Sequence, residues 1–97
     1  MTLVPHPHGL HIAGEIDYGS HHLLAGGLDG AILDGRSDIR LDLSGLTFID
    51  VAGLRLIVTT AARLSPGRRL VLAPLSPMVR RLLALTGWQH APGLHIP

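Results

Sequence analysis

Apolar and polar residues alternate in two clear stretches of this chain, and each alternation predicts a β-strand. Leu10, Ile12 and Ile16 alternate with polar or small residues around Gly14, which is typical of a half-buried strand, and a short strand at Leu3-Val4 is a candidate before it. The segment 39–43 alternates in the same way and predicts a second strand, which ends at Ser44-Gly45.

Helical spacing appears in three segments between and after these strands. Ser20 is a candidate N-cap for a helix that reaches about Asp34, the segment 52–64 predicts a second helix, and Ser76-Pro77 begins a third that runs to Thr86. The residues expected to face the interior are Leu24, Leu28 and Ile32 in the first helix, Leu54, Ile57, Val58, Ala61 and Leu64 in the second, and Met78 or Val79, Leu82 and Leu85 in the third.

A third strand is predicted at residues 70–72, and the tail 93–96 is a candidate for a last one. The order is therefore β(β)αβαβαβ, an α/β fold in one small domain over residues 1–97. Strands separated by helices favour a mixed, mostly parallel sheet of four or five strands flanked by three or more helices. Exposed edge strands of such a sheet would permit a homodimer.

Composition narrows the functional classes. The chain has 97 residues, is 46% hydrophobic and contains no cysteine, so disulfides, thiolate zinc sites and cysteine nucleophiles are excluded. Its first residues lack the basic and apolar regions of a secretory signal, and no apolar run is long enough to span a bilayer. We therefore expect a cytoplasmic protein without direct membrane insertion.

The charge balance argues against a nucleic-acid partner. The net charge is only +1, all eight basic residues are arginines, and the aromatic residues are limited to one Tyr, one Phe and one Trp. A nucleic-acid surface needs a denser basic patch with stacking rings.

The stretch "LSGLTFIDVAGLRLIV", residues 43–58, passes from a strand pattern into a helix pattern. Asp50 stands just before the helix and is expected to cap it by accepting the N–H of Ala52 or Gly53. Gly53 is unfavourable so early in a helix, and a close approach by another backbone would explain it. The side chains of Val51, Ala52 and Gly53 carry no reactive group.

Candidate chemistry elsewhere is sparse. The seven histidines match no trusted zinc spacing, so solvated loop and edge positions are expected for them, with no metal site. Ser20, Ser44 and Thr47 lack a nucleophile motif, and no phosphate-binding glycine loop with a lysine is present. We expect neither an enzyme nor a bound cofactor.

The stretch "LDLSGLTFIDVAGLRLIV", with "GEIDYGS" before it and "LSPMVRRLLALTG" after it, resembles the STAS domain family of anti-sigma-factor antagonists and their relatives. The resemblance covers about residues 8–90 in the family's order. It implies a small sheet flanked by helices, as the residue patterns also predict.

The resemblance also assigns roles to the corner. In antagonist members the helix begins Asp-Ser-Ser-Gly or similar, and the anti-sigma factor, a histidine-kinase-like ATPase, phosphorylates the second hydroxyl position to break the contact. Asp50, Gly53 and Leu54 match the motif, but Val51 and Ala52 occupy the hydroxyl positions. The nearest hydroxyls, Thr47, Thr59 and Thr60, do not match the acceptor position, and Asp17 matches an acid that usually lies beside the partner surface.

Three functional hypotheses follow from the resemblance. The first is a non-catalytic module that docks onto such an ATPase through Asp50–Arg55 and Asp17–Ser20, without a phospho-switch at Ala52. The second is a STAS subunit of a lipid-transport ABC complex, in which the same corner contacts the ATPase subunit. The third is a domain that senses a small ligand or nucleotide, for which the glycine-rich first helix could line a pocket.

Overall fold

A computed structural model describes residues 1–33, 35 and 37–97 of the chain. In this part it contains five strands, three α-helices and two 3-10 turns. They are β1 (Thr2–His6), β2 (Gly9–Ile16), η1 (Tyr18–Ser20), α1 (His21–Leu33), β3 (Ile39–Ile49), α2 (Val51–Ala62), β4 (Leu70–Leu72), α3 (Pro77–Thr86), η2 (Trp88–His90) and β5 (Leu94–His95). The expected end of the first helix at Asp34 lies outside the described residues.

The five strands form one mixed sheet whose spatial order follows the chain order, β1-β2-β3-β4-β5. β1 pairs with β2 in antiparallel fashion, and every later neighbouring pair is parallel. The expectation of a mixed, mostly parallel α/β sheet of four or five strands flanked by three or more helices is therefore confirmed.

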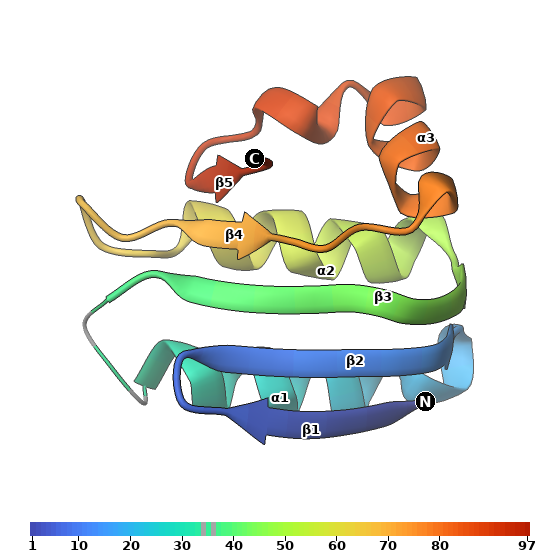
Figure 1. The fold of residues 1–97 in the computed structure, drawn as a ribbon, viewed down its shortest axis with the longest axis horizontal. Coiled ribbons are helices and arrows are strands. Elements are labelled where there is room, and N and C mark those ends of the chain that lie inside the picture. The colour runs from blue at the N-terminus through green and yellow to red at the C-terminus, as the bar shows by residue number, and fades with distance from the viewer. Residues whose placement is uncertain (34, 36) are drawn as a thin grey trace.

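Helices α1 and α2 cover the same face of this sheet and lie side by side, whereas α3 lies beyond β4 and leads through η2 into β5 (Figure 1). The reason is topological, because right-handed crossovers that advance in one direction across a sheet return on the same face each time. Both helices consequently begin at the same end of the sheet, where β2 and β3 finish.

The core lies between the sheet and the helices and contains most of the apolar residues that the periodicity selected. Leu24 and Leu28 of α1, and Leu54, Ile57 and Ala61 of α2, are buried as expected. In α3 the prediction is partly wrong, because Leu85 is 73% exposed while Val79 and Leu83 are buried. No helix of the described residues is long and apolar enough to cross a membrane.

Two predicted boundaries are also wrong. β3 continues past Ser44-Gly45 to Ile49, because the segment from Leu46 onward still pairs with β2 across irregularities in the register. Ser20 is not a separate N-cap residue of α1. It is the last residue of η1, and η1 continues directly into α1.

Candidate functional site

The register between β2 and β3 brings two strand-to-helix corners together. Ile16 and Ile49 are paired at the ends of the two strands, and the N–H of Asp50 donates to the carbonyl of Ile16 over 3.0 Å. Asp17 and Asp50 follow these residues directly, so the two acidic residues emerge at the same edge of the sheet. Each one stands at the start of the helical segment that follows.

Asp50 is held by two contacts of different kinds. Its Oδ1 accepts the N–H of Gly53 over 2.7 Å, which confirms the expected N-cap of α2. Nε2 of His21, from the first turn of α1, lies 2.8 Å from Oδ1 and 2.9 Å from Oδ2. The pair therefore ties the beginning of α1 to the beginning of α2.

The environment of Asp50 favours the ionised carboxylate. Partial burial acts to raise the pKa of Asp50, but the hydrogen bond from His21, the N–H of Gly53 and the charge of His21 together outweigh it. The pKa of Asp50 is consequently lower than its ordinary value of 3.8. A carboxylate at a helix N-terminus also interacts favourably with the helix dipole.

Asp17 and Ser20 form a reciprocal capping box. The Asp17 carboxylate accepts the N–H of Gly19 over 3.1 Å, and the Ser20 hydroxyl accepts the N–H of Asp17 over 3.0 Å. Ser20 is only 8% exposed, and its hydroxyl forms hydrogen bonds within this turn, so the side chain is buried beneath the surface. We therefore assign Ser20 a supporting role, in place of the predicted contact with a partner.

Gly53 and Leu54 also lie in the interior rather than on the predicted contact surface. Leu54 is fully buried in the core. A Cβ at Gly53 would lie 2.5 Å from Cγ2 of Ile16 and 2.9 Å from Oδ1 of Asp50. The glycine is thus required by a side chain of β2 and by the cap itself, which corrects the expectation that another backbone approaches there.

The remaining residues, which are exposed or partly exposed, lie at this end of the sheet. Val51 is 46% exposed, and Ala52, Asp17 and Arg55 are exposed as well. Tyr18, which is 89% exposed, stands beside them with its ring 6.0 Å from that of His21. We call this surface the docking corner, and it consists of Asp17, Tyr18, Asp50, Val51, Ala52 and Arg55.

Sequence reasoning missed three contributors to this end of the molecule. His21 is a hydrogen-bond partner of Asp50 rather than a solvated loop histidine, and Tyr18 and Phe48 are large apolar side chains left exposed beside Asp17 and Asp50. The exposed aromatic residues could have been found from their adjacency to the two acids. The His21–Asp50 contact joins residues 29 positions apart, so it depends on the register of β2 and β3.

The hydroxyl groups elsewhere are engaged in local structure. Ser44 donates to Oδ1 of Asp42 over 2.6 Å, and Nδ1 of His11 lies 3.2 Å from Oδ2 of the same carboxylate. The Ser44 hydroxyl hydrogen bond is the main reason that the pKa of Asp42 is lowered. In a catalytic triad the serine donates to the imidazole, which in turn contacts the carboxylate. Here the serine donates to the carboxylate directly, so Ser44, Asp42 and His11 do not have that arrangement.

The threonines near the corner are similarly occupied. Thr47 donates to the carbonyl of Gly14 over 3.2 Å from β3, and Thr59 and Thr60 donate back to carbonyls of α2. Thr60 is almost fully buried. These contacts place none of the three hydroxyls at the position of Ala52.

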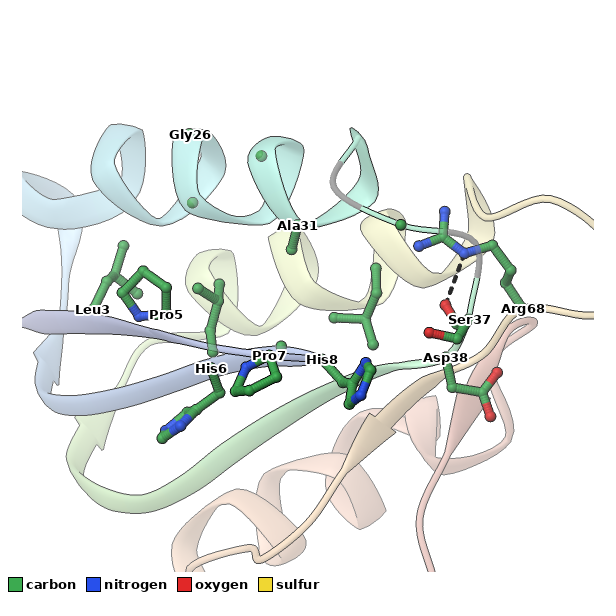
Figure 2. Close-up of a pocket in the computed structure, with 16 residues that line it drawn as sticks. Leu3, Pro5, His6, Pro7, His8, Gly26, Ala31, Ser37, Asp38 and Arg68 are labelled. Carbon is green, nitrogen blue, oxygen red and sulfur yellow. Dashed lines mark hydrogen bonds between the residues drawn. The ribbon is translucent and has the colours of Figure 1, made fainter.

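A cavity of about 370 Å³ lies between α1 and the β1–β2 hairpin. Figure 2 shows its lining, with Leu3, Pro5 and Pro7 on one side and Gly26 and Ala31 on the other. The glycine-rich helix therefore does line a pocket, as the ligand-sensing hypothesis requires. In residues 1–33, 35 and 37–97, no three His, Asp or Glu side chains are arranged to hold a metal ion.

Comparisons with known proteins agree with this architecture. A family model described as "Mlab, STAS domain" matches residues 2–96. The crystal structure of an anti-sigma factor antagonist from Mycobacterium paratuberculosis is similar, with a TM-score of 0.77 and 24% identity over 97% of this chain and 82% of that chain.

Two structures of SpoIIAA are similar as well. The unphosphorylated anti-sigma factor antagonist has a TM-score of 0.68 and 22% identity over 99% of this chain and 86% of that one. The phosphorylated form, a Bacillus cell fate determinant, has a TM-score of 0.65 and 21% identity over 99% and 89%. No curated protein matches the sequence. At these low sequence identities, the structural similarity shows that this chain and the three structures share a fold.

Proposed function

Because the chain belongs to the STAS domain family, we propose that it is a non-catalytic interaction module that docks onto an ATPase-type partner through the docking corner. The preferred partner is an anti-sigma factor of the histidine-kinase-like type in the cytoplasm. The observation that carries the proposal is the exposed apolar surface of Val51 and Ala52 at the capped start of α2. Exposed apolar residues rimmed by charged ones are typical of protein interaction sites.

The proposed interaction is not switched by phosphorylation at position 52. Phosphorylation would add about −1.5 to −2 charges at pH 7. Together with the neighbouring Asp50 carboxylate, that charge would repel acidic residues of a docked partner. Ala52 has no oxygen to accept a phosphate. The proposed module is therefore a constitutive antagonist, or a competitor of relatives that are phosphorylated.

A charge placed at position 52 tests the docking corner. In pull-downs against anti-sigma kinases of the same genome, Ala52→Asp should abolish binding because it puts a carboxylate in the middle of the apolar contact. The first turn of a helix tolerates an acid, so folding should be unaffected. Ala62→Asp adds the same charge to the exposed far end of α2 and should bind as the wild type does.

Each outcome of this experiment has a meaning. Binding that survives Ala52→Asp would show that the interface lies outside the docking corner. Phosphate incorporation into the wild type during incubation with the kinase and ATP would disprove the proposal that the protein lacks a phosphorylation switch. With Ala52→Ser, a kinase partner should incorporate phosphate. Binding only to an ABC ATPase subunit would favour the alternative of a lipid-transport complex, which uses the same corner.

Ligand sensing is a second candidate because of the cavity under α1. Gly30 lines this cavity, and a Cβ at Gly30 would have no atom within 4 Å. A Gly30→Leu side chain should therefore occupy part of the space without disturbing the helix. A ligand from a panel of GTP, ATP and fatty acids should raise the melting temperature of the wild type and lose that effect with Gly30→Leu. A panel with no stabilising member would remove this candidate.

A further inference from the structure

The charges of this chain are divided between its two halves. All seven acidic residues lie in residues 1–50, whereas residues 51–97 contain six of the eight arginines and no Asp or Glu. The second half supplies α2, β4, α3, η2 and β5, of which β4, α3, η2 and β5 lie together beyond β3 (Figure 1). A charge asymmetry of this kind favours an anionic ligand or partner.

An open pocket of about 550 Å³ lies within this basic half, between α3, η2 and β5. Arg80, His90 and His95 contribute to its lining, and no carboxylate lines it among the described residues. Leu94 and Ile96, which are partly exposed, supply apolar surface in the same pocket. Its volume is within the range typical of small-molecule sites.

Two further observations point to a ligand in this pocket. The amide oxygen of Gln89, which also lines the pocket, is buried and has no hydrogen-bond partner in the described part of the chain. Buried polar atoms are normally satisfied, so an unpaired one calls for an additional partner. Arg80 likewise makes no ion pair among the described residues, while Arg63 and Arg69 pair with Asp29 and Asp38.

We infer that this pocket binds a phosphate group carried on a small apolar or ring-shaped body. A guanidinium offers several donors in a planar fork and matches phosphate oxygens, and two imidazoles add further donors when they face the anion. Leu94 and Ile96 would contact the apolar body. The Gln89 amide would donate to the phosphate through its nitrogen after rotation by 180°, which exchanges the amide oxygen and nitrogen.

The chain contains a reporter for this site. Trp88 is the only tryptophan and precedes Gln89 in η2. The guanidinium of Arg55 lies over its ring, 5.8 Å from the ring centre. A titration of the wild type with phenyl phosphate should change the Trp88 fluorescence saturably and raise the melting temperature. Phenol, which has the ring without the phosphate, should do neither.

Two neighbouring arginines of α3 provide the matched variants. Arg80 lines the pocket and Arg81 does not, although both are exposed and carry the same charge. Arg80→Gln should weaken the binding of phenyl phosphate by roughly tenfold or more, because a hydrogen bond to a charged group is lost. Arg81→Gln should leave it close to wild type. His95→Gln, a second variant at the pocket, should weaken binding as well.

The remaining arms separate the sources of phosphate and the competing explanations. Arg80-dependent binding to phosphatidic acid vesicles, without binding of phenyl phosphate, would identify a lipid headgroup as the source. Equal losses in the two arginine variants would show unspecific charge attraction and overturn the inference, as would equal binding of phenol or no response at all. Ala52→Asp should bind phenyl phosphate normally, because the pocket is separate from the docking corner.

Discussion

Asp50 shows how one residue can support both the fold and the proposed interaction surface. Its carboxylate caps α2 through Gly53 and also binds His21 of α1, so it joins the two helices where they begin. The side chain remains 29% exposed, which leaves part of it available to a partner. Val51 and Ala52 follow Asp50 directly as the first residues of α2.

The ionised form of Asp50 should stabilise the protein in a defined pH window. Its pKa is lowered in the folded protein, so the contribution is present in full above the ordinary pKa of 3.8 and is lost as the pH falls through the folded value. Asp50→Asn keeps a capping oxygen and removes the charge. We expect it to reduce the free energy of unfolding by about 0.5–1 kcal/mol near neutral pH.

Urea unfolding at a series of pH values measures this effect. The difference in free energy of unfolding between the wild type and Asp50→Asn should shrink as the pH falls below the ordinary pKa of 3.8. His21→Gln removes the partner while leaving the Asp50 cap, and should cost a similar amount near neutral pH. A difference that stays constant with pH would show that the charge of Asp50 contributes nothing.

At the scale of elements, α3 shows which choices helical periodicity leaves open. Spacings of three and four residues both lie on one side of a helix, so Met78 or Val79, Leu82 and Leu85 formed a plausible inner face. In the structure Val79 and Leu83 point into the core and Leu85 faces solvent. The way α3 packs against the rest of the fold determines which of its residues face the core.

Alanine substitutions in α3 test that assignment. Leu83→Ala should lower the free energy of unfolding by about 2–5 kcal/mol, because it leaves a cavity in the core. Leu85→Ala, two residues away on the same helix and 73% exposed, should change it by less than about 0.5 kcal/mol. Chemical denaturation of the two variants provides the comparison, and equal losses would contradict the observed orientation of the helix.

At the scale of the whole molecule, one core and a few ion pairs join the acidic and basic halves of the chain. Leu72, Val79 and Leu83 from the second half pack in the same cluster as Ile12 and Leu41 from the first. Arg63 bridges to Asp29 over 2.9 Å and Arg69 to Asp38 over 3.5 Å. Exposed pairs of this kind contribute little each, so the shared core provides most of the cohesion.

We therefore predict that residues 1–97 unfold as one cooperative unit. Far-UV circular dichroism reports all helices, whereas Trp88 fluorescence reports η2 in the last part of the chain. The two denaturation curves should coincide within error, as expected for a small two-state domain. A Trp88 transition that precedes the loss of helix would indicate that α3, η2 and β5 form a separate unit.

The local features of this protein follow from short stretches of its amino-acid sequence. Alternation predicted β2 and the first part of β3, Ser76-Pro77 predicted the start of α3, and Asp50 was recognised as a cap, because each depends on neighbouring residues only. The sequence also showed that position 52 is an alanine. Its resemblance to the STAS family supplied the expectation of a docking surface.

The tertiary structure decided what depends on distant contacts. The pairing of Ile16 with Ile49 determined that Asp17 and Asp50 lie together, and His21 reached Asp50 only because α1 and α2 start at the same end of the sheet. The packing of Ile16 against Gly53 explained a glycine that local reasoning had attributed to an approaching backbone. Local patterns predict which elements form, but strand register and packing decide which side chains meet.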